Sequence, residues 1–168
     1  YRDRRQRQMC IRDRPKTLTN MPLVIQRTAI TNPGTVNEVA TFTIKQFTYA
    51  DRAVGDEETN PLPSFHNKRI NKVLFFRNRL AFLAGENVIL SQAGTLGEPD
   101  FFAQTALTVS ANDPVDIACS STFPSELFDG IDINTGLVVF SSNQQFLLSS
   151  DDTVFNPDTA KLRSLATN

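Results

Sequence analysis

The sequence predicts an all-β fold built from antiparallel hairpins and short sheets. Short apolar runs are separated by clusters of Asn, Pro, Gly, Asp and Ser, a pattern typical of strands joined by turns. Helical periodicity is nearly absent. Thirteen Phe residues in a chain of 168 residues supply enough apolar surface for a single core.

The first fourteen residues, YRDRRQRQMCIRDR, resemble a sequencing artefact more than a protein segment. The stretch RRQRQMCIRD is what CGT CGG CAG CGT CAG ATG TGT ATA AGA GAC encodes, and that string resembles an adapter of transposase-based sequencing libraries. The other interpretation is a basic arm that binds phosphate backbones. We predict that residues 1–14 are adapter translation, not native, disordered and packed against nothing, and we leave them out of the fold.

Without this stretch the chain is acidic. Eleven basic residues remain against sixteen acidic ones, a net charge of −5. Cys119 is then the single cysteine, which permits no internal disulfide and is typical of a buried small side chain. The longest apolar runs fall far short of the about 20 residues that a membrane span needs, so we expect no membrane segment.

The amino-terminal part predicts a hairpin followed by a long loop. The runs MPLVIQRTAI and EVATFTIKQFTY are separated by the turn Asn32-Pro33-Gly34-Thr35. Phe42 and Ile44 alternate with threonines and Lys45, which predicts a strand with one buried face. Residues 50–64, ADRAVGDEETNPLPS, predict an exposed loop whose Asp-Glu-Glu triplet is a solvated acidic tip or, less favoured, a cation site.

The segment RINKVLFFRNRLAFLAGENVILSQAG carries the densest strand signal. Residues 73–76, 80–84 and 88–90 predict three strands, the last two joined by a tight turn at Gly85-Glu86-Asn87. They are apolar on both faces, so we expect a sheet covered on both sides by stacked sheets.

Two further regions complete the predicted fold. DPVDIACSS alternates with a period of two and favours a strand over a short helix that begins at Pro114. Residues 137–140 and 146–148 predict a hairpin around Ser142-Asn143. The preceding string DGIDINTG is interpreted as a turn, and the segment after Asn156-Pro157-Asp158 is only weakly patterned.

No motif for catalysis, metal binding or cofactor binding is complete. His66 is the single histidine, which weakens every Ser-His-Asp, Cys-His or zinc proposal and favours a surface residue. Carboxylates for glycoside hydrolysis are present, but no spacing singles out a pair: Asp100, Asp113, Asp116, Asp129 and Asp132. We therefore predict no enzyme activity, no metal and no cofactor.

One charge feature remains, a basic segment of five cations within twelve residues, interleaved with Phe75 and Phe76. Its members are Lys68, Arg69, Lys72, Arg77 and Arg79. They are candidates for a surface that faces DNA. The favoured alternative is that they protect sheet edges or form salt bridges between subunits, because the chain as a whole is acidic.

Three strings occur in one order: NPLPSF, FFRNRLAFLAGENVILSQAG and DPVDIA. With them the chain resembles the tail tubular protein B family, also called the tail nozzle, of short-tailed, podovirus-type bacteriophages. The resemblance runs from Asn20 to the carboxyl end. It departs from the family in the inserted GTLGEP and in the missing flanks, since family members are several times longer.

The resemblance implies a structural component of the virion tail, made in the host bacterial cytoplasm. Family members form a homohexameric, six-fold ring below the adaptor ring, surround the DNA-ejection channel and help to anchor tail fibres. Their central region is similar to a β-propeller. Residues 15–168 are then an internal β-rich fragment, with propeller-like hairpins at about 66–150, that we expect to aggregate in isolation.

Two functional expectations follow from the resemblance. Contact with genomic DNA should be transient and nonspecific, because a conduit must let DNA slide. The alternative function is a glycan-binding or envelope-degrading module of the phage tail, which would need carboxylates that converge in a cleft.

Overall fold

The computed structural model describes residues 21–94, 99–105, 107–121, 124–151 and 155–165. Within these residues every regular element is a β-strand and every strand pair is antiparallel, which confirms the all-β prediction. The strands are β1 (Leu23–Thr31), β2 (Val39–Gln46), β3 (Lys72–Phe76), β4 (Arg79–Ala84), β5 (Asn87–Leu90), β6 (Val115–Ala118), β7 (Leu127–Ile133), β8 (Gly136–Ser141), β9 (Gln145–Ser150) and β10 (Ala160–Leu165).

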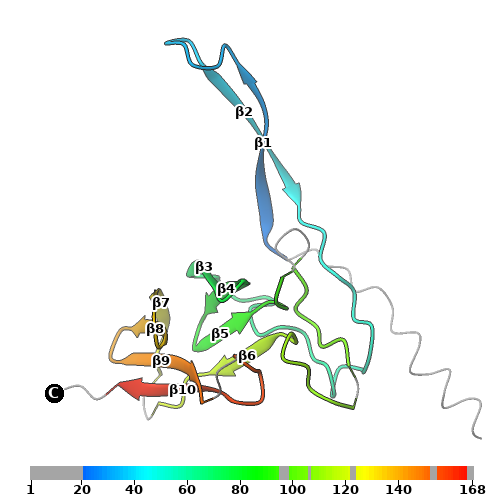
Figure 1. Cartoon of the computed structure of the whole chain (residues 1–168), viewed down its shortest axis with the longest axis vertical. Coiled ribbons are helices and arrows are strands. Elements are labelled where there is room, and N and C mark those ends of the chain that lie inside the picture. Colours follow the sequence, from blue (N-terminus) through cyan, green and yellow to red (C-terminus); the bar gives the residue numbers. More distant parts are fainter. Residues whose placement is uncertain (1–20, 95–98, 106, 122–123, 152–154, 166–168) are drawn as a thin grey trace, which may run out of the picture. The chain divides into compact units, whose positions relative to one another are not determined.

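The chain divides into two units, of which the smaller is Thr17–Thr48. Its described part is a long hairpin of β1 and β2 (Figure 1). The backbone reverses at the predicted turn, where Asn32 and Gly34 have φ angles of 51° and 74°. The prediction that this hairpin has a buried face is wrong: Phe42 is 59% exposed and Ile44 is 68% exposed.

The larger unit, from Tyr49 onward, contains two four-stranded sheets (Figure 1). One sheet has the order β3-β4-β5-β6 and the other has the order β7-β8-β9-β10. Each is thus a meander in which every strand pairs with its neighbour in sequence. Short turns join most of these pairs, whereas a long irregular segment joins β5 to β6.

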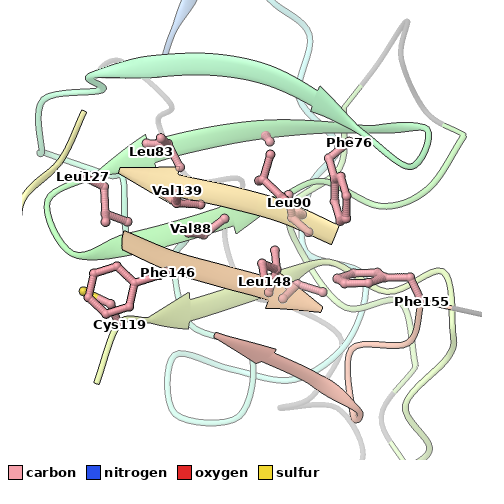
Figure 2. Packing of buried hydrophobic residues seen from close by; sticks show 13 residues of the cluster. Phe76, Leu83, Val88, Leu90, Cys119, Leu127, Val139, Phe146, Leu148 and Phe155 are labelled. Atoms are coloured by element: carbon pink, nitrogen blue, oxygen red, sulfur yellow. The ribbon is translucent and has the colours of Figure 1, made fainter. Parts of the chain in front are cut away.

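The main core lies between these two sheets. Leu83, Val88 and Leu90 of the first sheet and Phe146 and Leu148 of the second belong to one buried cluster (Figure 2). Cys119 is in the same cluster at 7% exposure, as predicted for a small buried side chain, and burial raises the pKa of its thiol. The alternation of side chains along each strand gives both sheets an apolar inner face.

The second face of the first sheet is covered at β4 but not at β3, where Val73 and Phe75 are 53% and 65% exposed on the same side. The prediction of a sheet covered on both sides is thus confirmed for β4, and the expected cover by a further stacked sheet is wrong. Phe82 of β4 contacts Phe65 edge to face and Phe101 in a stacked geometry, with ring centroids 5.0 and 5.3 Å apart. Phe65 and Phe101 come from the segments before β3 and after β5, so irregular chain supplies this cover.

The predicted hairpins agree with the strand register. Leu137 pairs with Leu148, Ala84 pairs with Asn87, and the DPVDIACSS segment forms the strand β6. The interpretation of DGIDINTG as a turn is wrong, because residues 127–133 form β7 and the turn is only Asn134-Thr135. The weakly patterned end contains the strand β10, which the sequence did not predict.

Apolar side chains remain exposed on the outer surfaces of both sheets. Phe75 of β3 is 65% exposed, and Ile131 of β7 is 56% exposed. Ile133 and Phe140 lie on the same outer side as Ile131, since they alternate with the buried Leu137 and Val139 in the β7–β8 pairing. Exposed apolar strand faces of this kind are typical of surfaces that other protein segments cover.

Candidate interface residues

The basic segment predicted from the sequence does not form one patch. Lys68 and Arg69 are exposed in the loop before β3, Lys72 begins β3, and Arg77 lies in the turn after it. A strand rises about 3.3 Å per residue, so Lys72 and Arg77 are separated by roughly 16 Å along β3.

Lys72 forms an ion pair between neighbouring sheets. Its Nζ lies 2.9 Å from Oδ1 of Asp129 in β7. The hydrogen bond from Lys72, together with the backbone N–H of Gly130, lowers the pKa of the Asp129 carboxyl. Both side chains are largely exposed, so the pair adds little to stability.

Arg77 lies in the two-residue turn between β3 and β4. Arg77 and Asn78 have φ angles of 47° and 61°, the left-handed pair that a type I′ hairpin turn requires. The guanidinium carbon of Arg77 lies 5.6 Å from the ring centre of Phe76. The charge itself points to solvent, so Arg77 remains a candidate for contact with another molecule, as do Lys68 and Arg69.

Arg79 differs from the other four cations because it is only 2% exposed. Its Nη1 donates hydrogen bonds to the carbonyl oxygens of Ser91 and Asp113 at 2.8 and 2.7 Å, and its Nη2 donates to Ala111 at 2.6 Å. Burial lowers its pKa, and the attraction of Asp113 partly offsets this effect. In this chain Arg79 therefore cannot face DNA, and it instead fixes the turn at 110–113.

Two buried carboxylates complete this polar cluster. Asp113 Oδ2 accepts from the backbone N–H of Ser110 at 2.9 Å and from Oγ1 of Thr105 at 3.1 Å. Asp100 Oδ1 accepts from the N–H of Phe102 at 2.8 Å, and burial raises the pKa of its carboxyl. Arg79, Asp100 and Asp113 thus anchor the irregular segment between β5 and β6 onto the sheet.

Asp116 and His66 also form hydrogen bonds within the fold, whereas Asp132 is exposed on β7. Asp116 accepts hydrogen bonds from the N–H of Ser64 at 2.7 Å and from Nδ2 of Asn87 at 3.0 Å. His66 Nδ1 lies 3.1 Å from Nδ2 of Asn67. Among the residues that the structure describes, no group of three or more His, Cys, Asp or Glu side chains is placed to hold a metal ion.

The loop at 50–64 is exposed at its acidic tip but anchored at its end. Asp56 Oδ1 accepts from the N–H groups of Glu58 and Thr59, and these bonds lower the pKa of its carboxyl. Asn60 is buried, and its Nδ2 donates to the carbonyl oxygens of Val54 and Ala103 at 3.0 and 2.9 Å. The sequence analysis did not identify Asn60 as a buried anchor, because asparagine is equally typical of an exposed turn.

An open hollow of about 380 Å³ lies beside the anchored segment. Its lining includes Thr59, Thr105, Thr108 and Asp113. The Asp113 carboxyl already accepts hydrogen bonds from Oγ1 of Thr105 and from the N–H of Ser110. No described helix has the length and apolar character needed to cross a membrane.

These features define a class of protein. The buried polar side chains hold the fold together, and the exposed strand faces are apolar, as in structural proteins that act by assembly. The chain belongs to the bacteriophage nozzle protein family, whose family model matches residues 14–167. It is therefore a structural component of a phage tail.

A curated relative agrees with this assignment. The chain is 37% identical over 113 residues to the tail tubular protein gp12 of Escherichia phage T7. The aligned part covers 67% of this chain and 14% of the relative. The family match leaves out residues 1–13, and the adapter interpretation of residues 1–14, which lie outside the described residues, stays a prediction.

Proposed function

We propose that the full-length protein forms a ring in the phage tail nozzle and that this ring surrounds the channel through which DNA leaves the particle. The observation that carries the proposal is the nozzle family match over residues 14–167. The ring is homohexameric, lies below an adaptor ring and helps to anchor tail fibres. These finer features come from the family resemblance.

The two meanders of the larger unit are proposed to be consecutive blades of a propeller-like region. Neighbouring blades of a propeller are four-stranded antiparallel sheets that pack face to face. The sheets β3–β6 and β7–β10 have this topology, and their inner faces share one buried cluster. The exposed Ile131 and Phe140 then lie where a further sheet of the full-length protein would pack.

The role is proposed to be structural and not enzymatic. The carboxylates of Asp100, Asp113 and Asp116 each accept hydrogen bonds from backbone N–H groups. Bonds of this kind hold each side chain in place, which suits an anchor of the fold.

The rival function is a glycan-binding or envelope-degrading tail module. A described feature that could serve it is the hollow beside Thr105 and Thr108. Purified full-length protein incubated with host surface polysaccharide separates the two functions. Binding or cleavage that is lost in the Thr105→Val variant would favour the rival, and the structural proposal expects neither.

The ring itself is tested by native mass spectrometry and negative-stain electron microscopy of the full-length protein. We expect one closed oligomer with a central opening. A protein that stays monomeric, both alone and with its neighbouring tail proteins, would contradict the proposal.

A further inference from the structure

We infer that Asp100 is a buried proton-binding group and that a proton on its carboxyl tightens the hold of residues 99–105 on the first sheet. Residues 99–105 are called the clasp here. The inference goes beyond the proposed ring and does not depend on it. It rests on the burial of Asp100, the neutral partners of its carboxylate, a second buried carboxylate in the same cluster and an amide that can turn over.

Asp100 lies away from water. It is 3% exposed, and the two residues that follow it, Phe101 and Phe102, are buried as well. The ring of Phe101 packs against Phe65 and Phe82, with centroids 4.9 and 5.3 Å apart. An ionised carboxylate in such a site is costly unless a cation or several strong donors compensate it. The partners of the carboxylate therefore decide which protonation state the site favours.

The partners of the Asp100 carboxylate are neutral donors. Oδ1 accepts from the backbone N–H of Phe102 at 2.8 Å, and Oδ2 accepts from Nε2 of Gln104. No ion pair among the described residues includes Asp100. Burial raises the pKa of the carboxyl and outweighs the effect of these bonds and of the N–H of Phe101, which lower it.

A second buried carboxylate and one buried cation share the cluster. Asp113 is 3% exposed, and its charge adds to the effect of burial on the pKa of Asp100. Arg79 is 2% exposed, and its terminal nitrogens donate to backbone carbonyl oxygens. The charge of Arg79 is attracted to Asp113. One guanidinium thus stands against two carboxylates, which favours a proton on one of them.

Two further titratable side chains approach from the segment that precedes β3. The guanidinium carbon of Arg52 lies 5.3 Å from the ring centre of Phe102. The ring of Tyr49 lies 6.2 Å from that of Phe101, and burial raises the pKa of its hydroxyl to about 12. Tyr49 is therefore neutral at neutral pH, and the charge of Arg52 lies over an aromatic ring.

Gln104 lets the site take up a proton without the loss of a hydrogen bond. In the ionised state Nε2 of Gln104 donates to Oδ2 of Asp100. When a proton from water binds Oδ2, a half-turn of the Gln104 amide places Oε1 where it accepts from the new hydroxyl. Oδ1 still accepts from the N–H of Phe102. The buried charge is thus removed while the number of bonds stays the same.

The clasp is bound to its surroundings through these same residues. The N–H of Gln92 donates to the carbonyl of Asp100 at 2.7 Å, and the N–H of Gln104 lies 3.4 Å from Oδ1 of Asp113. Nδ2 of Asn60 donates to the carbonyl of Ala103 at 2.9 Å. Opening of the clasp returns Asp100 to water and to its ordinary pKa. Where the closed clasp is protonated, opening therefore releases a proton, and acid opposes it.

The direction with pH follows from the raised pKa. The contribution of Asp100 to closure is complete below the ordinary Asp pKa and is lost as the pH rises through the raised value. Exposed carboxylates respond in the opposite way. Hydrogen bonds from Thr59 lower the pKa of Asp56, and a bond from Lys72 lowers that of Asp129, so these contributions are lost as the pH falls. Acid thus weakens these surface contacts and tightens the clasp.

The test is hydrogen exchange of the full-length protein, followed by mass spectrometry of peptides that contain residues 101–105, from acidic to neutral pH. Protection is the exchange rate of the unfolded peptide divided by that of the protein at the same pH. Asp100→Asn mimics the protonated form, because its Oδ1 accepts from Phe102 and its Nδ2 donates to Oε1 of Gln104. Asp113→Asn makes the same chemical change in the same cluster and is the matched control.

We expect Asp100→Asn to protect the clasp at least as well as the unmodified protein at neutral pH. As the pH falls, protection of the unmodified protein should rise relative to Asp100→Asn by at most about tenfold per pH unit, the limit for one proton. Asp113→Asn should lower protection at neutral pH at least about tenfold, because it leaves the buried charge of Arg79 without its carboxylate.

Two outcomes would overturn the inference. If Asp100→Asn lowers protection at neutral pH as much as Asp113→Asn does, Asp100 acts as a charged anchor. A ratio of protection between the unmodified protein and Asp100→Asn that does not change with pH would show that no proton binds. If circular dichroism shows that Asp113→Asn does not fold, this ratio still decides. Neither outcome affects the ring, which is tested by oligomeric state.

Discussion

Nη1 of Arg79, at the start of β4, donates a 2.7 Å hydrogen bond to the backbone carbonyl of Asp113, just before β6. The two residues are 34 positions apart in sequence, and both are buried. This bond ties the end of a long irregular segment to the first sheet. Arg79, one of the candidates for DNA contact predicted from the sequence, thus stabilises the fold from inside.

The first prediction concerns that anchor. Arg79→Met removes the donors to Ser91, Ala111 and Asp113 and leaves buried carbonyls without partners. We expect a loss of about 3–5 kcal/mol in the free energy of unfolding and faster hydrogen exchange at 110–113. Arg77→Met, the exposed control two residues earlier, should cost at most about 1 kcal/mol. Equal effects of the two variants would contradict the anchoring role.

The second prediction concerns Gly136, the first residue of β8. A Cβ at this position would lie 2.2 Å from the backbone oxygen of Leu148, so Gly136→Ala must displace β9. We expect a loss of at least about 3 kcal/mol, measured by chemical denaturation. Gly85→Ala is the control, because its Cβ would meet no atom within 4 Å and only its φ of 59° opposes the change. Its cost should be about 1–2 kcal/mol. A harmless Gly136→Ala would refute the pairing of β8 with β9.

The third prediction concerns the pH dependence of the Lys72–Asp129 pair. The pKa of Asp129 is lowered in the folded state, so its contribution to stability is complete above the ordinary Asp pKa and is lost as the pH falls through the lowered value. Lys72→Met should raise the pKa of Asp129 toward the ordinary value, as followed by a nuclear magnetic resonance titration of the carboxyl. Lys45→Met should leave it unchanged. A pKa that Lys72→Met does not move would show that the pair does not form.

The fourth prediction concerns DNA. We expect weak, nonspecific binding by the full-length ring that falls steeply as salt rises. Single Gln variants of Lys68, Arg69 and Arg77 should each reduce the slope of log affinity against log salt by about 1 if that residue contacts phosphate. Arg79→Gln should not act through phosphate contact, since its side chain is buried. Tight binding that hardly depends on salt would contradict a sliding contact.

The fifth prediction concerns residues 15–168 in isolation. Ile131 and Phe75 are 56% and 65% exposed, so this segment should aggregate when it is separated from the rest of the protein. Replacing both with Thr should raise its solubility, whereas Leu107→Thr should not, because Leu107 lies in a loop and not on a strand face. A soluble monomer of the unmodified segment that melts cooperatively would contradict the expectation.

The sequence predicted the strands whose side chains are apolar on both faces, such as Leu80–Ala84, because burial there leaves a continuous signal. It missed β7, where Asp129, Gly130 and Asp132 resemble a turn. Gly130 is required there by close packing, since a Cβ would lie 3.0 Å from Cδ1 of Leu74. That contact joins two sheets and cannot be inferred from local pattern.

The candidate site was harder to predict than the fold. Arg77 and Arg79 lie two residues apart and carry the same charge. Arg79 differs because the carbonyl oxygens of Ser91, Ala111 and Asp113, distant in sequence, accept its hydrogen bonds. The β1–β2 hairpin shows the opposite case. The alternation of Phe42 and Ile44 correctly predicted a strand, but the buried face that it also predicted is absent, since these side chains are 59% and 68% exposed.

The most direct test of the central claim is electron cryomicroscopy of the intact phage tail. The account predicts that the two four-stranded sheets of residues 72–165 occur in every subunit of one ring and that this ring surrounds the path of the DNA. Density for these sheets outside such a ring, as in a separate fibre or spike, would contradict it.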